Sequence, residues 1–135
     1  MNIEELKKQF IVDEDVLRAR LEPLVTKALN HCKLDKQGQV IILNHDLRAR
    51  DQIMLVLSAR AIGAQLDPAM SANVTAAELA KYTHLPADQV RARSTDLVKS
   101  RLAESPERGV FRAIAHKVEA FLDAISLPRG KRGPS

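Results

Sequence analysis

The sequence predicts a mainly α-helical protein with one small β-hairpin, and three observations support this fold class. First, long segments carry apolar residues at helical spacing. Second, a strand, a tight turn and a second strand follow one another near the C-terminus. Third, the chain has 135 residues, 45% hydrophobic and 28% charged, which suits one compact domain of ordinary size. With 5 Gly and 6 Pro, the composition is not that of a low-complexity chain.

The first segment, residues 2–36, is expected to be helical. Asp13 is the expected N-cap, because the carboxylates that follow it suit the start of a helix. Pro23 lies inside this segment and should kink the helix or split it into two. An apolar stripe runs along the helix through Leu17, Leu21, Leu24, Ala28, Leu29 and Cys32.

A strand and the most hydrophobic helix come next. Residues 34–38 form a turn, and residues 39–43 form a short β-branched strand. The segment 46–66 returns to helical spacing, with Asp46 as its cap. Because this helix is apolar nearly all round, it is expected to be the buried centre of the domain. Its polar residues include Arg48 and Arg50 in the first turn and Arg60 later.

The second half of the chain contains two helices joined by a tight turn. After a loop at residues 67–74, Thr75 and Glu78 fit a capping box that begins a helix over residues 76–83. His84 and Leu85 make the turn, and a second helix covers residues 86–100. A hairpin at 102–114 turns at Ser105-Pro106-Glu107-Arg108-Gly109. A last helix, 115–126, precedes a flexible basic tail at 128–135.

The order helix, tight turn, helix, β-hairpin resembles the winged helix-turn-helix family of DNA-binding domains. The stretch from Thr75 to Leu97, TAAELAKYTHLPADQVRARSTDL, carries the resemblance, and Arg101 to Arg112 resembles a short wing. The resemblance implies a winged helix-turn-helix core with additional N-terminal helices and a C-terminal helix. The expected division is an N-terminal helical extension at 1–36, the winged domain at 37–114, the C-terminal helix at 115–127 and the tail at 128–135.

Two positions depart from the family pattern. His84 stands where glycine is usual, so it is expected to take the left-handed backbone conformation that glycine adopts most easily. Ser94 stands where leucine is usual, which suggests looser packing at that end of the second helix.

The resemblance implies that helix 86–100 enters the major groove of duplex DNA and that wing 102–114 contacts the backbone or the minor groove. Gln89 could contact adenine and Arg91 guanine, while Arg93 and Lys99 suit phosphates. The full set of expected DNA-binding residues is Gln89, Arg91, Arg93, Thr95, Lys99, Arg108 and Arg112. The alternative for each cation on the helix is a solvated surface.

The charge distribution supports nucleic acid only modestly. The formal net charge of the chain is +4, and the segment 75–117 carries +3 of it, from eight cations and five carboxylates. Aromatic residues make up 3% of the chain, too few to stack single-stranded bases on several rings. A sequence-specific transcriptional regulator is therefore the leading hypothesis, and a winged-helix protein-interaction module within a larger assembly is the alternative.

The sequence carries no recognisable catalytic, metal or cofactor motif, so we expect neither an enzyme nor a cofactor. Cys32 is the only cysteine and is expected to be a small buried hydrophobe. No apolar run is long enough to span a bilayer, so a cytoplasmic protein without a membrane partner is expected. A homodimer through the C-terminal helix or the N-terminal helices is one expectation, and capping of the monomer's own core by these helices is the other.

Overall fold

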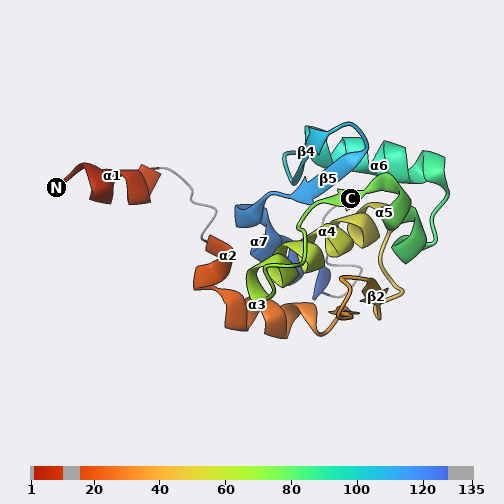
Figure 1. Cartoon of the computed structure of the whole chain (residues 1–135), viewed down its shortest axis with the longest axis horizontal. Helices are drawn as coiled ribbons and strands as arrows, with labels where there is room; N and C mark the ends of the chain where they lie inside the picture. The colour runs from red at the N-terminus through yellow and green to blue at the C-terminus, as the bar shows by residue number, and fades with distance from the viewer. Residues whose placement is uncertain (1, 11–15, 128–135) are drawn as a thin grey trace.

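The structure is a computed structural model that describes residues 2–10 and 16–127. It is mainly helical, as the sequence predicts, and has two small antiparallel sheets where one β-hairpin was expected (Figure 1). The elements in chain order are α1 (Ile3–Phe10), α2 (Val16–Ala19), α3 (Leu21–Ala28), β1 (Cys32–Leu34), β2 (Val40–Ile42), α4 (Ala49–Leu66), β3 (Val74–Thr75), α5 (Ala76–Thr83), α6 (Ala87–Lys99), β4 (Ala103–Glu107), β5 (Val110–Ala113), a 3-10 turn (Ala115–Lys117) and α7 (Val118–Ile125).

Helix α4 forms the centre of the molecule, which confirms the prediction from its nearly all-round apolar surface. Every residue from Ile53 to Gly63 is buried. In Figure 1 it lies between α3 and β2 on one side and α6 on the other. A helix that is covered on several sides at once needs apolar residues around its whole circumference, because no side of it faces water.

The first sheet corrects the prediction that residues 2–36 are helical throughout. Residues 32–34 form β1, which pairs antiparallel with β2 in the register Cys32↔Ile42 and Leu34↔Val40. The turn between the strands is stabilised by Asp35, whose Oδ1 accepts hydrogen bonds from the backbone N–H groups of Gln37 and Gln39, each at 2.9 Å. Pairing with the β-branched strand thus overrides the helical spacing of the apolar stripe.

The starts of the N-terminal helices also differ from the expectation. The predicted helix is split near Pro23 rather than kinked. Helix α2 ends at Ala19, and Pro23 lies in the first turn of α3. A backbone N–H has no partner within the helix at that position, so its absence in proline costs nothing. Helix α4 begins at Ala49 with Arg48 as N-cap, so Asp46 does not cap it. Asp46 instead donates its backbone N–H to Asn44 Oδ1. The other predicted cap, Asp13, lies outside the described residues.

The two helices joined by a tight turn follow the prediction closely. The capping box is complete, with Glu78 N–H donating to Thr75 Oγ1 and Thr75 N–H donating to Glu78 Oε1, both at 3.1 Å. His84 has φ 61° and ψ 19°, the expected left-handed conformation. Ser94 is only 1% exposed, so water does not reach the position where looser packing was expected.

The second sheet has the strand order β3-β5-β4. Strand β3 was not anticipated, because the loop before α5 was expected to run through residue 74. It pairs with β5 through Val74↔Phe111 and Thr75↔Val110, so the hairpin is joined directly to the start of α5. The hairpin turn is shorter than expected, because Glu107 already pairs with Val110 and leaves Arg108 and Gly109 between the strands.

Helix α7 packs its apolar stripe inside the chain. Val118, Phe121, Leu122 and Ile125 are all buried, and α7 contacts both α3 and α4. The stripe that was expected either to pair with a partner or to cap the core therefore caps the core. The buried core extends from Leu17 to Ile125, and the β1–β2 hairpin joins the predicted segments 1–36 and 37–114. The predicted tail at 128–135 lies outside the described residues.

Candidate nucleic-acid interface

The outward face of α6 carries five of the seven predicted DNA-binding residues. Gln89, Arg91, Arg93, Thr95 and Lys99 are all exposed. They are exposed because Val90, Ser94 and Leu97 form the buried side of the helix. The remaining surface of α6 is therefore available to a partner along the length of the helix.

The cations of α6 lie on different parts of that face. At 3.6 residues per turn, Arg91 and Arg93 are separated by about 200° around the helix axis. They therefore occupy opposite flanks, and Lys99 lies between them on the outward side, about a turn and a half further along. This arrangement gives α6 a positive charge on each flank rather than a single positive stripe.

One flank of α6 opens into a basic hollow shared with the start of α4. The hollow has a volume of about 430 Å³ and is lined by Arg48, Ala49, Arg50, Arg93, Asp96, Lys99 and Ser100. Four of these side chains are cationic and one is a carboxylate, so the lining carries a formal charge of +3. We call it the basic hollow. The two arginines from α4 and the two cations from α6 meet here because the two helices pack directly on each other.

The carboxylate in the hollow interacts with one of the cations. Arg93 Nη2 lies 3.3 Å from Asp96 Oδ2, and both side chains are nearly half exposed. An exposed ion pair of this kind contributes little to stability, because water screens it. Breaking this ion pair therefore costs little free energy, so the Arg93 side chain can leave Asp96 and bind another anion.

The hairpin tip places Arg108 near the start of α5. Arg108 is exposed and shares a two-residue turn with Gly109, whose φ of 75° suits glycine. The carbonyl of Gly109 accepts a 2.9 Å hydrogen bond from the N–H of Ala76, the first residue of α5. The tip is thereby held against the helix pair.

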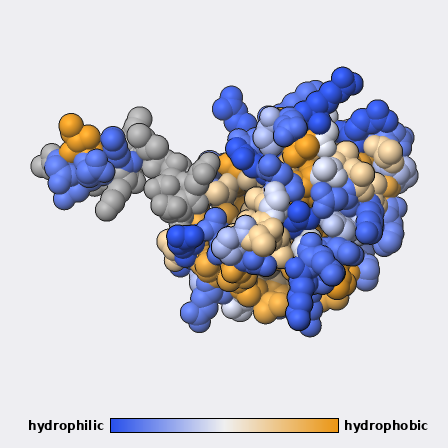
Figure 2. Space-filling view, in the orientation of Figure 1, coloured by the Kyte–Doolittle hydropathy of each residue, from blue (hydrophilic) through white to orange (hydrophobic). Residues whose placement is uncertain are grey.

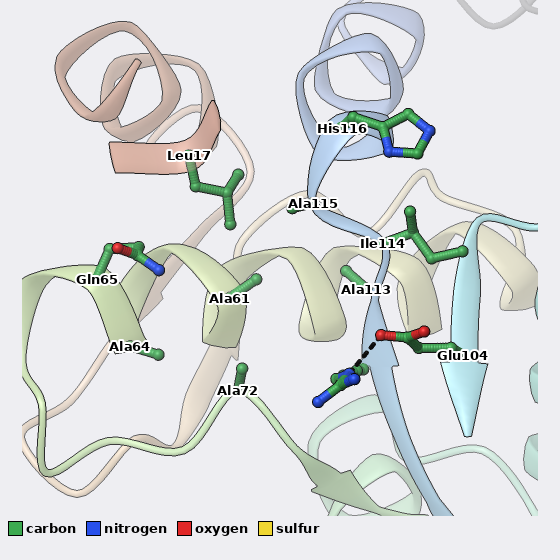
Figure 3. Close-up of a pocket in the computed structure, with 11 residues that line it drawn as sticks. Leu17, Ala61, Ala64, Gln65, Ala72, Glu104, Ala113, Ile114, Ala115 and His116 are labelled. Atoms are coloured by element: carbon green, nitrogen blue, oxygen red, sulfur yellow. Dashed lines mark hydrogen bonds and ion pairs between the residues drawn. The ribbon is translucent and has the colours of Figure 1, made fainter. Parts of the chain in front are cut away.

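Arg112 does not join the other predicted residues. Its Nε donates to Glu104 Oε1 across the hairpin, and it lines a separate hollow of about 250 Å³. In that hollow Glu104 and His116 lie on the hairpin side, while Leu17 and Gln65 come from α2 and α4 (Figure 3). Arg112 therefore lies in a different hollow from Arg93 and Lys99.

Three further arginines belong near this surface but were not among the predicted site residues. Arg48 and Arg50 can be placed in the first turn of a helix, but the sequence leaves open whether they join the Arg91 and Arg93 face, because nothing local to the sequence shows that this start lies beside α6. Arg101 follows α6 directly, is exposed and has a left-handed φ of 60°. The sequence does not mark Arg101 as the residue that ends the helix, because glycine is the residue usually found at that position.

The described part of the chain shows neither a metal-binding cluster nor a membrane-spanning helix, and its cysteine is buried. Within residues 2–10 and 16–127, no three His, Cys, Asp or Glu side chains cluster as a metal site would require. Cys32 is buried as expected, and burial raises the pKa of its thiol to about 11. No helix in those ranges is both long and apolar enough to cross a membrane.

The chain matches no family model, no curated protein and no solved structure. The assignment of a function therefore depends on the residues and the geometry described above.

Proposed function

We propose that the protein binds duplex DNA through a winged helix-turn-helix, with α6 in the major groove. The basic hollow beside the exposed face of α6 is the observation that carries this proposal. The order of elements supports it too: α4, β3, α5, a tight turn, α6 and the β4–β5 hairpin follow the order of helices and strands in that family. A transcriptional regulator is the corresponding biological role.

The dimensions of α6 suit this mode of binding. Its 13 residues make a helix of about 20 Å, and the major groove is about 12 Å wide. With the first half of α6 against the base edges, the flank that carries Arg93 faces a phosphate backbone. Gln89 and Arg91 are then the candidates for reading adenine and guanine, and the basic hollow receives phosphates.

The salt dependence of binding to a random duplex tests the proposal. Each phosphate contact contributes about −0.9 to the slope of log affinity against log salt concentration. Replacing Arg50 or Lys99 with alanine should weaken binding and make that slope shallower by about 0.9. Lys36→Ala is a matched control, because this exposed cation lies in the β1–β2 turn on the other side of α4 (Figure 1). Absence of binding at low salt would contradict the proposal.

Two further variants separate base reading from backbone contact. Arg91→Ala should cost about 1–3 kcal/mol on the preferred duplex and relax the preference at one base pair. Arg108→Ala should weaken binding to all sequences alike, since a contact to phosphate carries no sequence information. Fluorescence anisotropy on a set of duplexes that differ at single positions measures both effects. Equal affinities of the wild type and both variants would show that another face is used.

A second candidate function is a winged-helix module that binds protein. Asp88 at the start of α6 and the Glu104 and Glu107 side chains of the hairpin reduce the positive field that DNA binding needs. An exposed apolar groove on α3 and α4, described next, also favours a protein partner. Absence of DNA binding at low salt would favour this function over the first.

A further inference from the structure

An apolar groove lies on the side of the molecule away from α6. It has a volume of about 160 Å³ and is lined by Val25, Ala28, Leu29, Cys32, Lys33, Leu34, Ala59, Ile62 and Leu66, from α3, β1 and α4. Leu29 and Leu66 are 52% and 59% exposed. Figure 2 shows the corresponding hydrophobic surface along the lower side of the molecule, where α3 lies. We call it the α3–α4 groove.

The size of the groove defines the kind of occupant it accepts. An apolar cavity of roughly 150 Å³ is large enough to bind benzene, so the α3–α4 groove has room for one large aliphatic side chain, with further contacts at its rim. Lys33 is the only ionisable side chain in its lining apart from the buried thiol of Cys32. The groove therefore suits an apolar helix face with a carboxylate nearby.

Helix α1 has a surface of that kind. Ile3 and Leu6 are spaced i, i+3 on its eight residues and are 70% and 49% exposed. Glu5 lies in the same first turn, on the flank of Leu6 away from Lys7, where it can approach Lys33, whereas Glu4 lies 3.9 Å from Lys7 within α1. In Figure 1, α1 stands apart from the body of its own chain. One chain thus carries both an uncovered apolar helix and an uncovered apolar groove.

We propose that α1 of a second copy of this chain occupies the α3–α4 groove, and that the exchange is reciprocal and forms a two-fold dimer. Reciprocal exchange of an identical element fills both grooves with one kind of contact and leaves neither α1 exposed. Leu6 enters the groove, Ile3 packs at its rim against Leu29 or Leu66, and Glu5 approaches Lys33. This proposal goes beyond DNA binding and does not depend on it.

Sedimentation equilibrium tests the dimer with single substitutions on each side of the contact. Leu6→Glu and Leu29→Glu should each weaken dimerisation at least tenfold, because each removes a buried leucine side chain from two symmetric contacts. Leu43→Glu is the matched control, since Leu43 is a similarly exposed leucine that does not line the groove. Circular dichroism and the melting temperature verify that the variants fold. A monomeric wild-type chain, or equal weakening by all three variants, would overturn the proposal.

Disulfide trapping distinguishes a second copy from the chain's own α1. Chains carrying Leu6→Cys are mixed with chains carrying Leu29→Cys under mild oxidation. Both chains also carry Cys32→Ala, because Cys32 lines the groove that position 6 enters and its thiol would compete with the one introduced at position 29. A covalent product with one chain of each kind is expected, and neither variant alone should give it. If the double variant closes a disulfide only within one chain, its own α1 covers the groove and the proposal is wrong.

Discussion

Arg101 ends α6 in a left-handed backbone conformation. The end of α6 forms a Schellman motif, in which Arg101 N–H donates to the Val98 carbonyl and Leu102 N–H donates to the Leu97 carbonyl, at 3.1 and 3.0 Å. The motif requires a left-handed residue, and Arg101 supplies it with φ 60°. A non-glycine residue in this conformation is strained by about 1–2 kcal/mol.

Replacing Arg101 with glycine should therefore stabilise the protein by about 1 kcal/mol while weakening the proposed binding to DNA. The stability gain follows from removing Cβ, and the loss of affinity follows from removing a cation next to the exposed face of α6. Arg101→Ala separates the two effects, because it loses the charge and keeps the strain. Urea unfolding and duplex titration of the three chains provide the readout. If Arg101→Gly is no more stable than Arg101→Ala, the left-handed backbone at this position is not strained.

Arg60 holds together three segments around the start of α5. This buried side chain donates to the carbonyls of Gly38 and Ser71 and to Glu78 Oε2, at 3.0, 2.8 and 2.9 Å. Glu78 also completes the capping box of α5. Although desolvation alone would raise it, the pKa of Glu78 is lowered overall, chiefly by its hydrogen bond from Arg60.

Arg60→Met should destabilise the fold by about 3 kcal/mol or more, because it leaves partly buried carbonyls and a carboxylate without their donor. The midpoint of urea unfolding measures the loss. Arg18→Met serves as the control, since Arg18 is exposed and its removal should leave the midpoint nearly unchanged. Equal midpoints for both variants would mean that backbone pairing alone holds these segments.

At the scale of elements, an ion-pair network fastens α7 to the N-terminal helices. Glu119 of α7 accepts from Arg20 Nη2 at 2.7 Å and from Lys27 Nζ at 2.6 Å, and Lys27 also reaches Asp123 at 2.9 Å. The hydrogen bond from Arg20, followed by that from Lys27, lowers the pKa of Glu119 to about 2. The network joins helices that lie almost a hundred residues apart in the sequence.

The pH dependence of unfolding should report this network. Because the pKa of Glu119 is lower in the folded than in the unfolded chain, its contribution is complete above about pH 4.5. It is lost as the pH falls toward 2. Glu119→Gln should therefore lower the melting temperature at pH 7 and reduce its dependence on pH in that window. Glu22→Gln, in the exposed first turn of α3, is the control. Parallel curves for all three chains would contradict the assignment.

On the scale of the whole molecule, a single core joins the predicted segments. Leu24 of α3 and Leu97 of α6 are both fully buried in it. We expect one cooperative unfolding transition, in which Leu24→Ala and Leu97→Ala each cost about 2–5 kcal/mol. Urea unfolding followed by circular dichroism measures both variants. Two separate transitions, with each variant shifting only one, would instead support independent domains within residues 16–127.

Local patterns in the sequence were sufficient for the two helices α5 and α6 and the turn between them, but not for β3. The capping box of Thr75 and Glu78, the left-handed His84 and the bounds of α5 and α6 depend on residues a few positions apart, so they are readable from the chain. The same patterns failed at β1, because Cys32 fits a helical stripe as well as a strand. Only pairing with Ile42 decides between them.

The sequence by itself determined the helical character of the chain, the central role of α4 and the exposed residues of α6, because spacing and capping are local. The tertiary structure alone decided which charges lie together. It brought Arg48 and Arg50 beside Arg93 and Lys99, and paired Arg112 with Glu104 in another hollow. Side chains more than forty residues apart meet only through helix packing, which leaves no trace in local spacing.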